Sequence, residues 1–135
     1  MAYELKRSPK VTKEVQIGDE TLTIKIEAGV IAREFNQRYN AIIRAKHDFD
    51  NAKGSSDNTP AALEDVLRKL GNAVTALMEL CFGNENTAKI IKFYDGDYIE
   101  MIEYVVPFIV DEIMPAIEKA LKEKAEYLKK AKYRK

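Results

Sequence analysis

The hydrophobic periodicity changes once along this chain, and that change constrains the fold more than any other feature. Between residues 14 and 27, apolar and polar side chains alternate on both sides of a Gly18-Asp19 pair, which predicts an antiparallel β-hairpin. From Ala28 onward the apolar side chains recur at helical spacing. A hairpin alone is marginal in water, so its apolar face needs helices or its edge another strand. We expect a mainly α fold, α+β at the margin, with an N-terminal β-hairpin followed by a bundle of four to five helices.

Local signals place the helices. A long helix is predicted from Ala28 to about Ala52, and a second between the N-cap residue Thr59 and Gly83, with its apolar side chains in an arc of about 160°. A shorter helix follows over about 85–93. Asp97 and Glu100 have capping-box spacing for a fourth helix. Two prolines then interrupt the pattern: Pro107 is expected to kink or break this penultimate helix, and Pro115 to mark a second break or the start of the last helix.

A chain of 135 residues is expected to form a single domain with its own core. We divide it into an irregular arm (1–13), a β-hairpin (14–27), a helical core (28–118) and a basic C-terminal helix or tail (119–135). No stretch has the layout of a signal peptide, and no apolar run approaches 18 residues. These observations predict a cytosolic protein without membrane association.

The formal net charge of zero conceals a strong asymmetry near the C-terminus. Residues 93–118 carry seven acidic side chains and no Lys or Arg, whereas residues 119–135 carry eight basic side chains against two acidic ones. The neutral total argues against nonspecific nucleic-acid binding. One interpretation is that both blocks are solvated helix faces. The other is a dipolar protomer, in which the acidic patch of one copy meets the basic tail of the next.

Few side chains suited to catalysis are present. The single cysteine, Cys81, excludes an intramolecular disulfide and falls in the apolar arc of the second long helix, which predicts a core position. The single histidine, His47, falls on a polar helix face, where a solvated role is expected. Asp95, Asp97 and Glu100 form a dense carboxylate cluster that is best interpreted as a turn and a helix cap. We predict no catalytic residue, no metal site and no cofactor.

The apolar run around Pro107 allows two interpretations. It is either a kink that wraps the core or an apolar surface that binds amphipathic helices of another chain. Under the second interpretation, the predicted partner-binding residues are Tyr98, Met101, Ile102, Val105, Phe108 and Ile109. The apolar face of the hairpin is the predicted self-association surface, comprising Val15, Ile17, Leu22, Ile24 and Ile26.

The segment from Phe93 to Tyr104, continued through Pro107 and Pro115, follows a hairpin and two long helices. In size, element order, central acidic-apolar segment and lysine-rich end, the chain resembles the tail assembly chaperones of long-tailed bacteriophages and prophages of Gram-positive bacteria. The resemblance covers most of the chain.

This resemblance implies a non-enzymatic function in the host cytoplasm, outside the mature virion. Such a protein coats and solubilises the helical tape measure protein and helps to recruit tail tube subunits. The implied partners are therefore the tape measure protein, the tail tube protein and further copies of the chain, in a spiral or ring. Two alternatives remain open: a small structural virion component such as a tail connector protein, and an enzyme that uses Asp95, Asp97 and Glu100.

Overall fold

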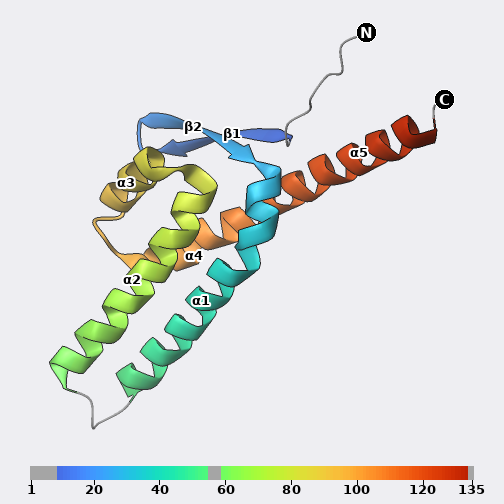
Figure 1. Ribbon diagram of the computed structural model, residues 1–135. Helices are drawn as coiled ribbons and strands as arrows, with labels where there is room; N and C mark the ends of the chain where they lie inside the picture. The colour runs from blue at the N-terminus through green and yellow to red at the C-terminus, as the bar shows by residue number, and fades with distance from the viewer. Residues whose placement is uncertain (1–8, 55–58, 134–135) are drawn as a thin grey trace.

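The computed structural model describes residues 9–54 and 59–133, with side chains up to residue 129 (Figure 1). A two-stranded N-terminal hairpin precedes a series of helices, as expected, and the fold class is confirmed as mainly α. In chain order the elements are β1 (Lys10–Ile17), β2 (Glu20–Glu27), α1 (Ala28–Gly54), α2 (Pro60–Phe82), α3 (Asn84–Phe93), α4 (Tyr98–Phe108), the π-helical turn η1 (Ile109–Ile113) and α5 (Met114–Tyr133).

The hairpin is longer than predicted. β1 begins at Lys10 rather than at residue 14, because all eight of its residues pair with β2, from Lys10 opposite Glu27 to Ile17 opposite Glu20. The turn contains Gly18 at a φ of 59°, a backbone conformation that favours glycine. Residues 10–13 of the predicted irregular arm are therefore strand, whereas residues 1–8 lie outside the described part of the chain.

One face of the hairpin lies on the helices and the other is exposed. On the covered face, Leu22, Ile24 and Ile26 of β2 are buried, whereas the β1 side chains, including Lys13, are half-buried. Lys13 is paired with Ile24, so its charged side chain stands within the apolar row of the outer strand. An inward-pointing charge on an edge strand is a recurrent device against pairing with further strands.

The two long helices have the predicted ends. The Thr59 hydroxyl accepts a hydrogen bond from the Ala62 amide at 3.1 Å, and the Gly83 amide donates to the Glu79 carbonyl at 3.0 Å. α1 and α2 pack against each other, and Arg38 of α1 joins them by donating to the carbonyl of Ala76 in α2 at 2.6 Å. α1 extends two residues beyond the predicted end, to Gly54, and residues 55–58 of the predicted loop lie outside the description.

The short helix α3 anchors the hairpin to the helices. Asn86 donates its side-chain amide to the backbone carbonyl of Thr23 at 3.1 Å. Lys89 forms an ion pair with Glu20 at 2.9 Å. Both contacts join α3 to β2, which fixes the hairpin above α3 (Figure 1).

From Tyr98 to Tyr133 the backbone remains helical through two prolines. Pro107 lies inside α4, and the chain changes two residues later to the π-helical turn η1, in which the Met114 amide bonds to the Ile109 carbonyl. Of the two predicted outcomes, a kink or a break, the break does not occur, because the backbone stays helical across Pro107; regular α-helical hydrogen bonding changes to a π-helical turn two residues later. Pro115 is the second residue of α5, so its predicted place at the start of the last helix is confirmed.

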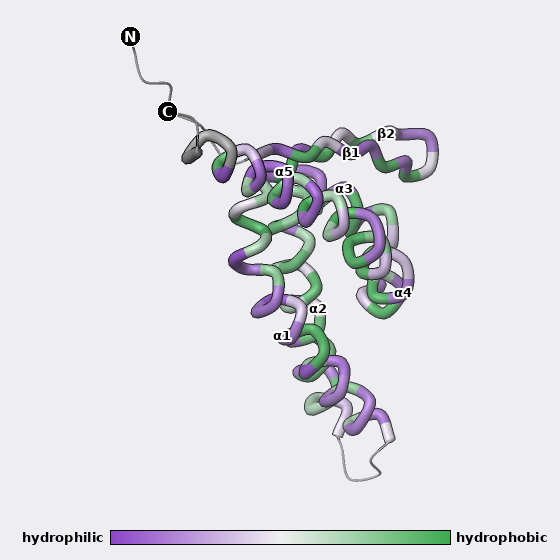
Figure 2. Tube along the Cα trace, turned by 90° about the vertical axis from the view of Figure 1, so that its right-hand side faces the viewer, coloured by the Kyte–Doolittle hydropathy of each residue, from purple (hydrophilic) through white to green (hydrophobic). Residues whose placement is uncertain are grey.

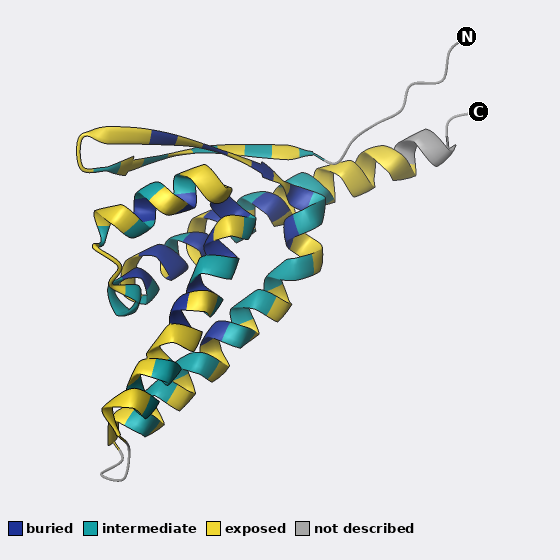
Figure 3. Cartoon of the chain, turned by 60° about the vertical axis from the view of Figure 1, so that its left-hand side comes forward, coloured by how far each residue is buried: buried dark blue, intermediate teal, exposed yellow. Residues whose placement is uncertain are grey.

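The molecule has a packed body and a thinner arm. The arm consists of residues 43–54 of α1 and 60–69 of α2, and none of its residues is buried. The body contains the remainder of α1 and α2 together with the hairpin, α3, α4, η1 and the first turns of α5, and it contains all of the buried core. Figure 3 shows this division as dark blue near the hairpin and yellow and teal along the arm. In Figure 2, hydrophobic residues gather in α2 and α4, whereas α5 is largely hydrophilic.

Candidate helix-binding grooves

Half of the six predicted partner-binding residues lie inside the protein. Met101, Val105 and Ile109 are at most 7% exposed, because their spacing of four places them on the stripe of the helical run that faces the body. The prediction of a partner-binding surface is wrong for these three residues, which form the core. Tyr98, Ile102 and Phe108 are half-buried and pack against the same core.

The predicted self-association face is also covered by the chain's own helices. Leu22, Ile24 and Ile26 are buried, so the prediction is wrong for these residues. Val15 and Ile17 are half-buried and pack against the core. An apolar hairpin face can be covered by intramolecular helices or by another copy, and in this fold the helices cover it.

The single cysteine and histidine lie where the sequence predicted. Cys81 is buried in the core, and burial raises the pKa of its thiol to about 12, although the positive charge of Arg38 lowers it in part. A thiol in this state is a poor nucleophile at neutral pH. His47 is exposed on α1, where its Nε2 lies 3.1 Å from the side-chain amide of Asn51.

The carboxylate cluster forms a turn and a helix cap, as predicted. The Asp97 side chain accepts a hydrogen bond from the Glu100 amide at 3.1 Å, and Asp95 occupies the turn with a φ of 53°. Within residues 9–54 and 59–133, no three side chains suited to metal binding come together. No helix in the same part of the chain is both long and apolar enough to cross a membrane.

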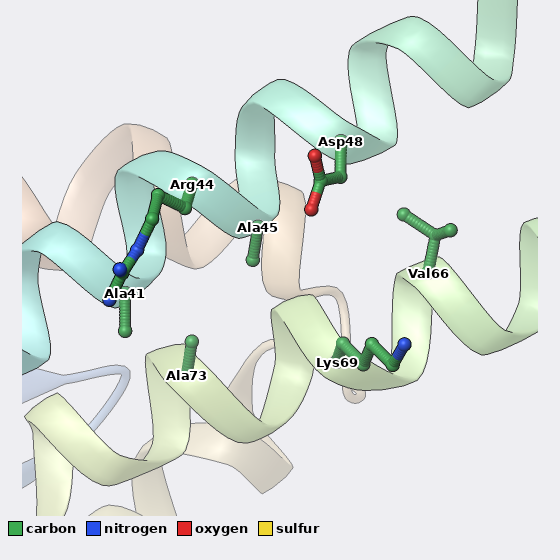
Figure 4. A pocket seen from close by; sticks show the side chains of 7 residues that line it. All are labelled: Ala41, Arg44, Ala45, Asp48, Val66, Lys69 and Ala73. Carbon is green, nitrogen blue, oxygen red and sulfur yellow. The ribbon is translucent and has the colours of Figure 1, made fainter.

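An open groove of about 460 Å³ lies between α1 and α2 where the arm joins the body (Figure 4). Alanines from the two helices point toward one another across it, and the lining residues are Ala41, Arg44, Ala45, Asp48, Val66, Lys69 and Ala73. We call this the arm groove. Alanine side chains are small, so a third helix could approach α1 and α2 closely along this groove.

Charges of both signs flank the arm groove. Arg44 and Asp48 lie one helical turn apart on α1, and neither forms an ion pair within the described residues. Lys69 on α2 pairs with Asp65 at 3.3 Å on an exposed surface. The groove therefore combines an apolar floor with charged edges, which suits an amphipathic helix that carries flanking charges.

A second groove lies where the arm meets the turn between α3 and α4. Its lining includes Tyr98, a predicted partner-binding residue, together with Phe49, Glu64, Leu67, Arg68, Gly96, Asp97 and Ile99. Tyr98 packs closely against α2 at Gly71: a Cβ atom added at Gly71 would lie only 2.6 Å from Cε2 of the Tyr98 ring. Leu67 is 38% exposed and leaves part of its apolar surface in solvent.

A third groove lies beneath the hairpin, between β1, α3 and α4, and we call it the aromatic groove. It includes Val105 and Phe108, two predicted partner-binding residues, and it is lined by Val15, Gln16, Ile17, Phe82, Ile90, Phe93, Tyr94, Tyr104, Val105 and Phe108. Phe93 is 49% exposed and Tyr104 is 62% exposed. Burial, with a smaller contribution from the nearby Glu100 carboxylate, raises the pKa of Tyr94.

Sequence reasoning missed the residues that open these grooves. Ala41 and Ala45 are spaced one helical turn apart, and this small-residue spacing is the signal that could have revealed the arm groove. For Phe93 and Tyr104 the sequence predicted a position in a helical segment but not the exposure of their rings. Their exposure depends on how α3 and α4 meet the hairpin, which no local pattern encodes.

Comparison of the chain with family models, with curated proteins and with solved structures found no match. The functional argument therefore rests on the residues and on the geometry described above.

Proposed function

We propose that this chain is a tail assembly chaperone of a long-tailed bacteriophage or prophage, acting in the host cytoplasm. It coats amphipathic helical segments of the tape measure protein, keeps that protein soluble and helps to recruit tail tube subunits around it. The observation that carries the proposal is the open arm groove, where two helices lack a third layer over their apolar side chains.

The arm groove suits a helical client better than a small molecule. It is an open trough between two helices, and its walls are helix surfaces rather than a closed cavity. A long amphipathic protein exposes an apolar stripe that promotes aggregation unless it is covered. A third helix placed against α1 and α2 would cover that stripe and the half-buried apolar residues of the arm in one step.

The charged edges favour tolerance of different client sequences. Arg44 and Asp48 present opposite charges along α1, so client helices with either charge at the flank find a partner. Such exposed pairs contribute only about 0.2–1 kcal/mol each. Coating therefore depends on many weak contacts repeated along the client.

The test is co-expression with the tape measure protein from the same genome, followed by measurement of the soluble client. The double variant Arg44→Glu, Val66→Ser changes one charged edge and one apolar wall of the arm groove, and we expect it to lose most of the soluble client. Ile43→Ser is the matched control, because Ile43 is an exposed apolar residue of α1 outside the grooves described above. Equal solubility with both variants would contradict the arm groove as the client site.

The composition of purified virions separates the chaperone from a tail connector. A chaperone leaves before the particle is complete, so the chain should be absent from finished virions. Its presence at a fixed copy number would overturn the proposal in favour of the structural alternative.

A further inference from the structure

The aromatic groove is small, and aromatic rings form half of its lining. Its volume is about 190 Å³, less than half that of the arm groove, so it suits a compact chemical group better than a helix. Five of the ten described residues that line it are aromatic. Among them, the buried Phe82 stacks with Phe108 at a distance of 6.4 Å between ring centroids.

Three of these rings stand around the open side of the groove. Phe93 and Tyr104 are 49% and 62% exposed. The rings of Phe93 and Tyr94 have their centroids 5.0 Å apart and meet at 83°, so they form two adjoining walls that face different directions. The face of an aromatic ring carries partial negative charge and attracts a cation that lies within about 6 Å of the ring centroid. Exposed rings around a hollow therefore favour a cationic ligand.

Carboxylates beside these rings also favour a cation. Glu100 lies one helical turn before Tyr104 on α4. Burial raises the pKa of Tyr94 and the Glu100 carboxylate raises it further, which places this negative charge close to the Tyr94 ring. Glu103 is exposed next to Tyr104 in sequence. Two tyrosines of the groove thus have an acidic neighbour.

Basic side chains on the same elements do not outweigh this negative charge. α4 and η1 carry four carboxylates and no Lys or Arg. On α3, Lys89 is neutralised by an ion pair with Glu20 at 2.9 Å. Lys10 lies at the end of β1 that is distant from the groove. Lys92 of α3 and Lys13 of β1 remain, so acidic side chains outnumber basic ones around the groove.

The polar groups of the lining indicate which kind of cation fits. Among the described residues that line the groove, only Gln16, Tyr94 and Tyr104 have polar side chains, and Gln16 already donates to the Gly18 carbonyl at 3.3 Å. A primary ammonium has three N–H donors and a guanidinium has five, and each donor needs an acceptor once it leaves water. A quaternary ammonium has no N–H donor. Aromatic rings alone can therefore replace its contacts with water.

We propose that the aromatic groove binds a small quaternary ammonium compound, with the trimethylammonium group held against the rings of Phe93, Tyr94 and Tyr104. The rings supply the cation–π attraction, and Glu100 and Glu103 supply a negative potential that concentrates cations near the groove. The site is separate from the arm groove. The inference therefore stands whether or not the arm groove binds a tape measure protein.

Titration of the full chain with choline, followed by calorimetry and by the NMR signals of the aromatic rings, tests the proposal. The reference ligand is the uncharged isostere of choline, in which a tert-butyl group replaces the trimethylammonium group. The two ligands have the same shape, so a difference in affinity measures the effect of the charge. Choline should bind about fivefold more tightly or better. Rising ionic strength should weaken the binding of choline and leave that of the isostere unchanged.

Two variants separate the ring from the carboxylate. Tyr104→Leu keeps an apolar side chain but removes the ring, so it should weaken choline binding about fivefold and change binding of the isostere little. Glu100→Gln removes a charge at nearly constant shape and should weaken binding of choline alone. Tyr127→Leu is the matched control, because Tyr127 is 57% exposed and lies outside the aromatic groove. Thermal melting of each variant checks that the fold is retained.

Three results would overturn the proposal: equal affinities of the wild type for choline and its isostere, no binding of choline at any concentration tested, or equal losses in Tyr104→Leu and Tyr127→Leu. The first two are measured on the wild type alone. A variant that fails to fold therefore does not prevent the test.

Discussion

The same two helices behave differently in the body and in the arm. In the body, Leu70, Val74 and Leu77 of α2 are completely buried, because α1, the hairpin, α3 and α4 surround that part of the helix. In the arm, Leu63 and Val66 continue the same apolar stripe but are only half-buried. An amphipathic stripe thus specifies which side of a helix is buried, but the number of packed layers determines how deeply.

The largest effect should come from truncating the same residue type in the two regions. Leu77→Ala removes a fully buried side chain and should lower the free energy of unfolding by about 2–5 kcal/mol. Leu67→Ala, ten residues earlier in α2, should cost about 1 kcal/mol or less because Leu67 is partly solvated. Urea denaturation of both variants measures the difference, and equal losses would contradict the division into body and arm.

Two glycines sharpen the comparison. A Cβ added at Gly71 would lie 2.6 Å from Tyr98 Cε2, so Gly71→Ala should cost about 1–3 kcal/mol of stability. At Gly54, at the tip of the arm, nothing lies within 4 Å, and Gly54→Ala should leave stability unchanged or raise it by up to about 1 kcal/mol. If the Tyr98 ring causes this loss, the double variant Gly71→Ala, Tyr98→Ala should lose less stability than the sum of the losses of the two single variants. Losses that simply add would exclude a clash.

The body also contains a buried titratable group. Because burial raises the pKa of Cys81 to about 12 from 9.0, the unfolded chain releases the thiol proton first as pH rises. The associated stability is present below pH 9 and is lost as pH rises toward 12. Between pH 9 and pH 10 the loss should be about 1 kcal/mol. Denaturation of the wild type and of Cys81→Ala at both pH values isolates this contribution, and parallel pH profiles would contradict it.

The smallest global effect is expected at the start of the arm. Thr59→Ala removes the hydroxyl that accepts from the Ala62 amide, a change that typically costs about 1 kcal/mol. Because the arm has no buried residues, this loss should appear as faster hydrogen exchange of the first α2 amides. The amides around Leu77 should exchange as before, and faster exchange throughout the body would show that the arm and the body unfold together.

Local structure was predictable because local signals encode it. Thr59, Pro60 and Gly83 set the ends of α2, and Asp97 sets the start of α4, within a residue of the prediction. The hairpin turn followed from Gly18-Asp19. Each of these features depends on hydrogen bonds between residues close together in the sequence.

The candidate sites were harder to predict because burial depends on neighbours distant in sequence. Met101, Val105 and Ile109 have the composition of a partner-binding surface, and only the packing of the body shows that they form the core. Tyr104 adjoins Val105 in sequence, yet it faces solvent. A continuous apolar run cannot specify which of its sides the rest of the chain will cover.

The position of Lys13 has a consequence for how this protein behaves when it is crowded. Its charge stands in the apolar row of the outer strand, where an added strand would have to desolvate it. Growth of the sheet by addition of a strand at its β1 edge is thereby disfavoured, even at high local concentration.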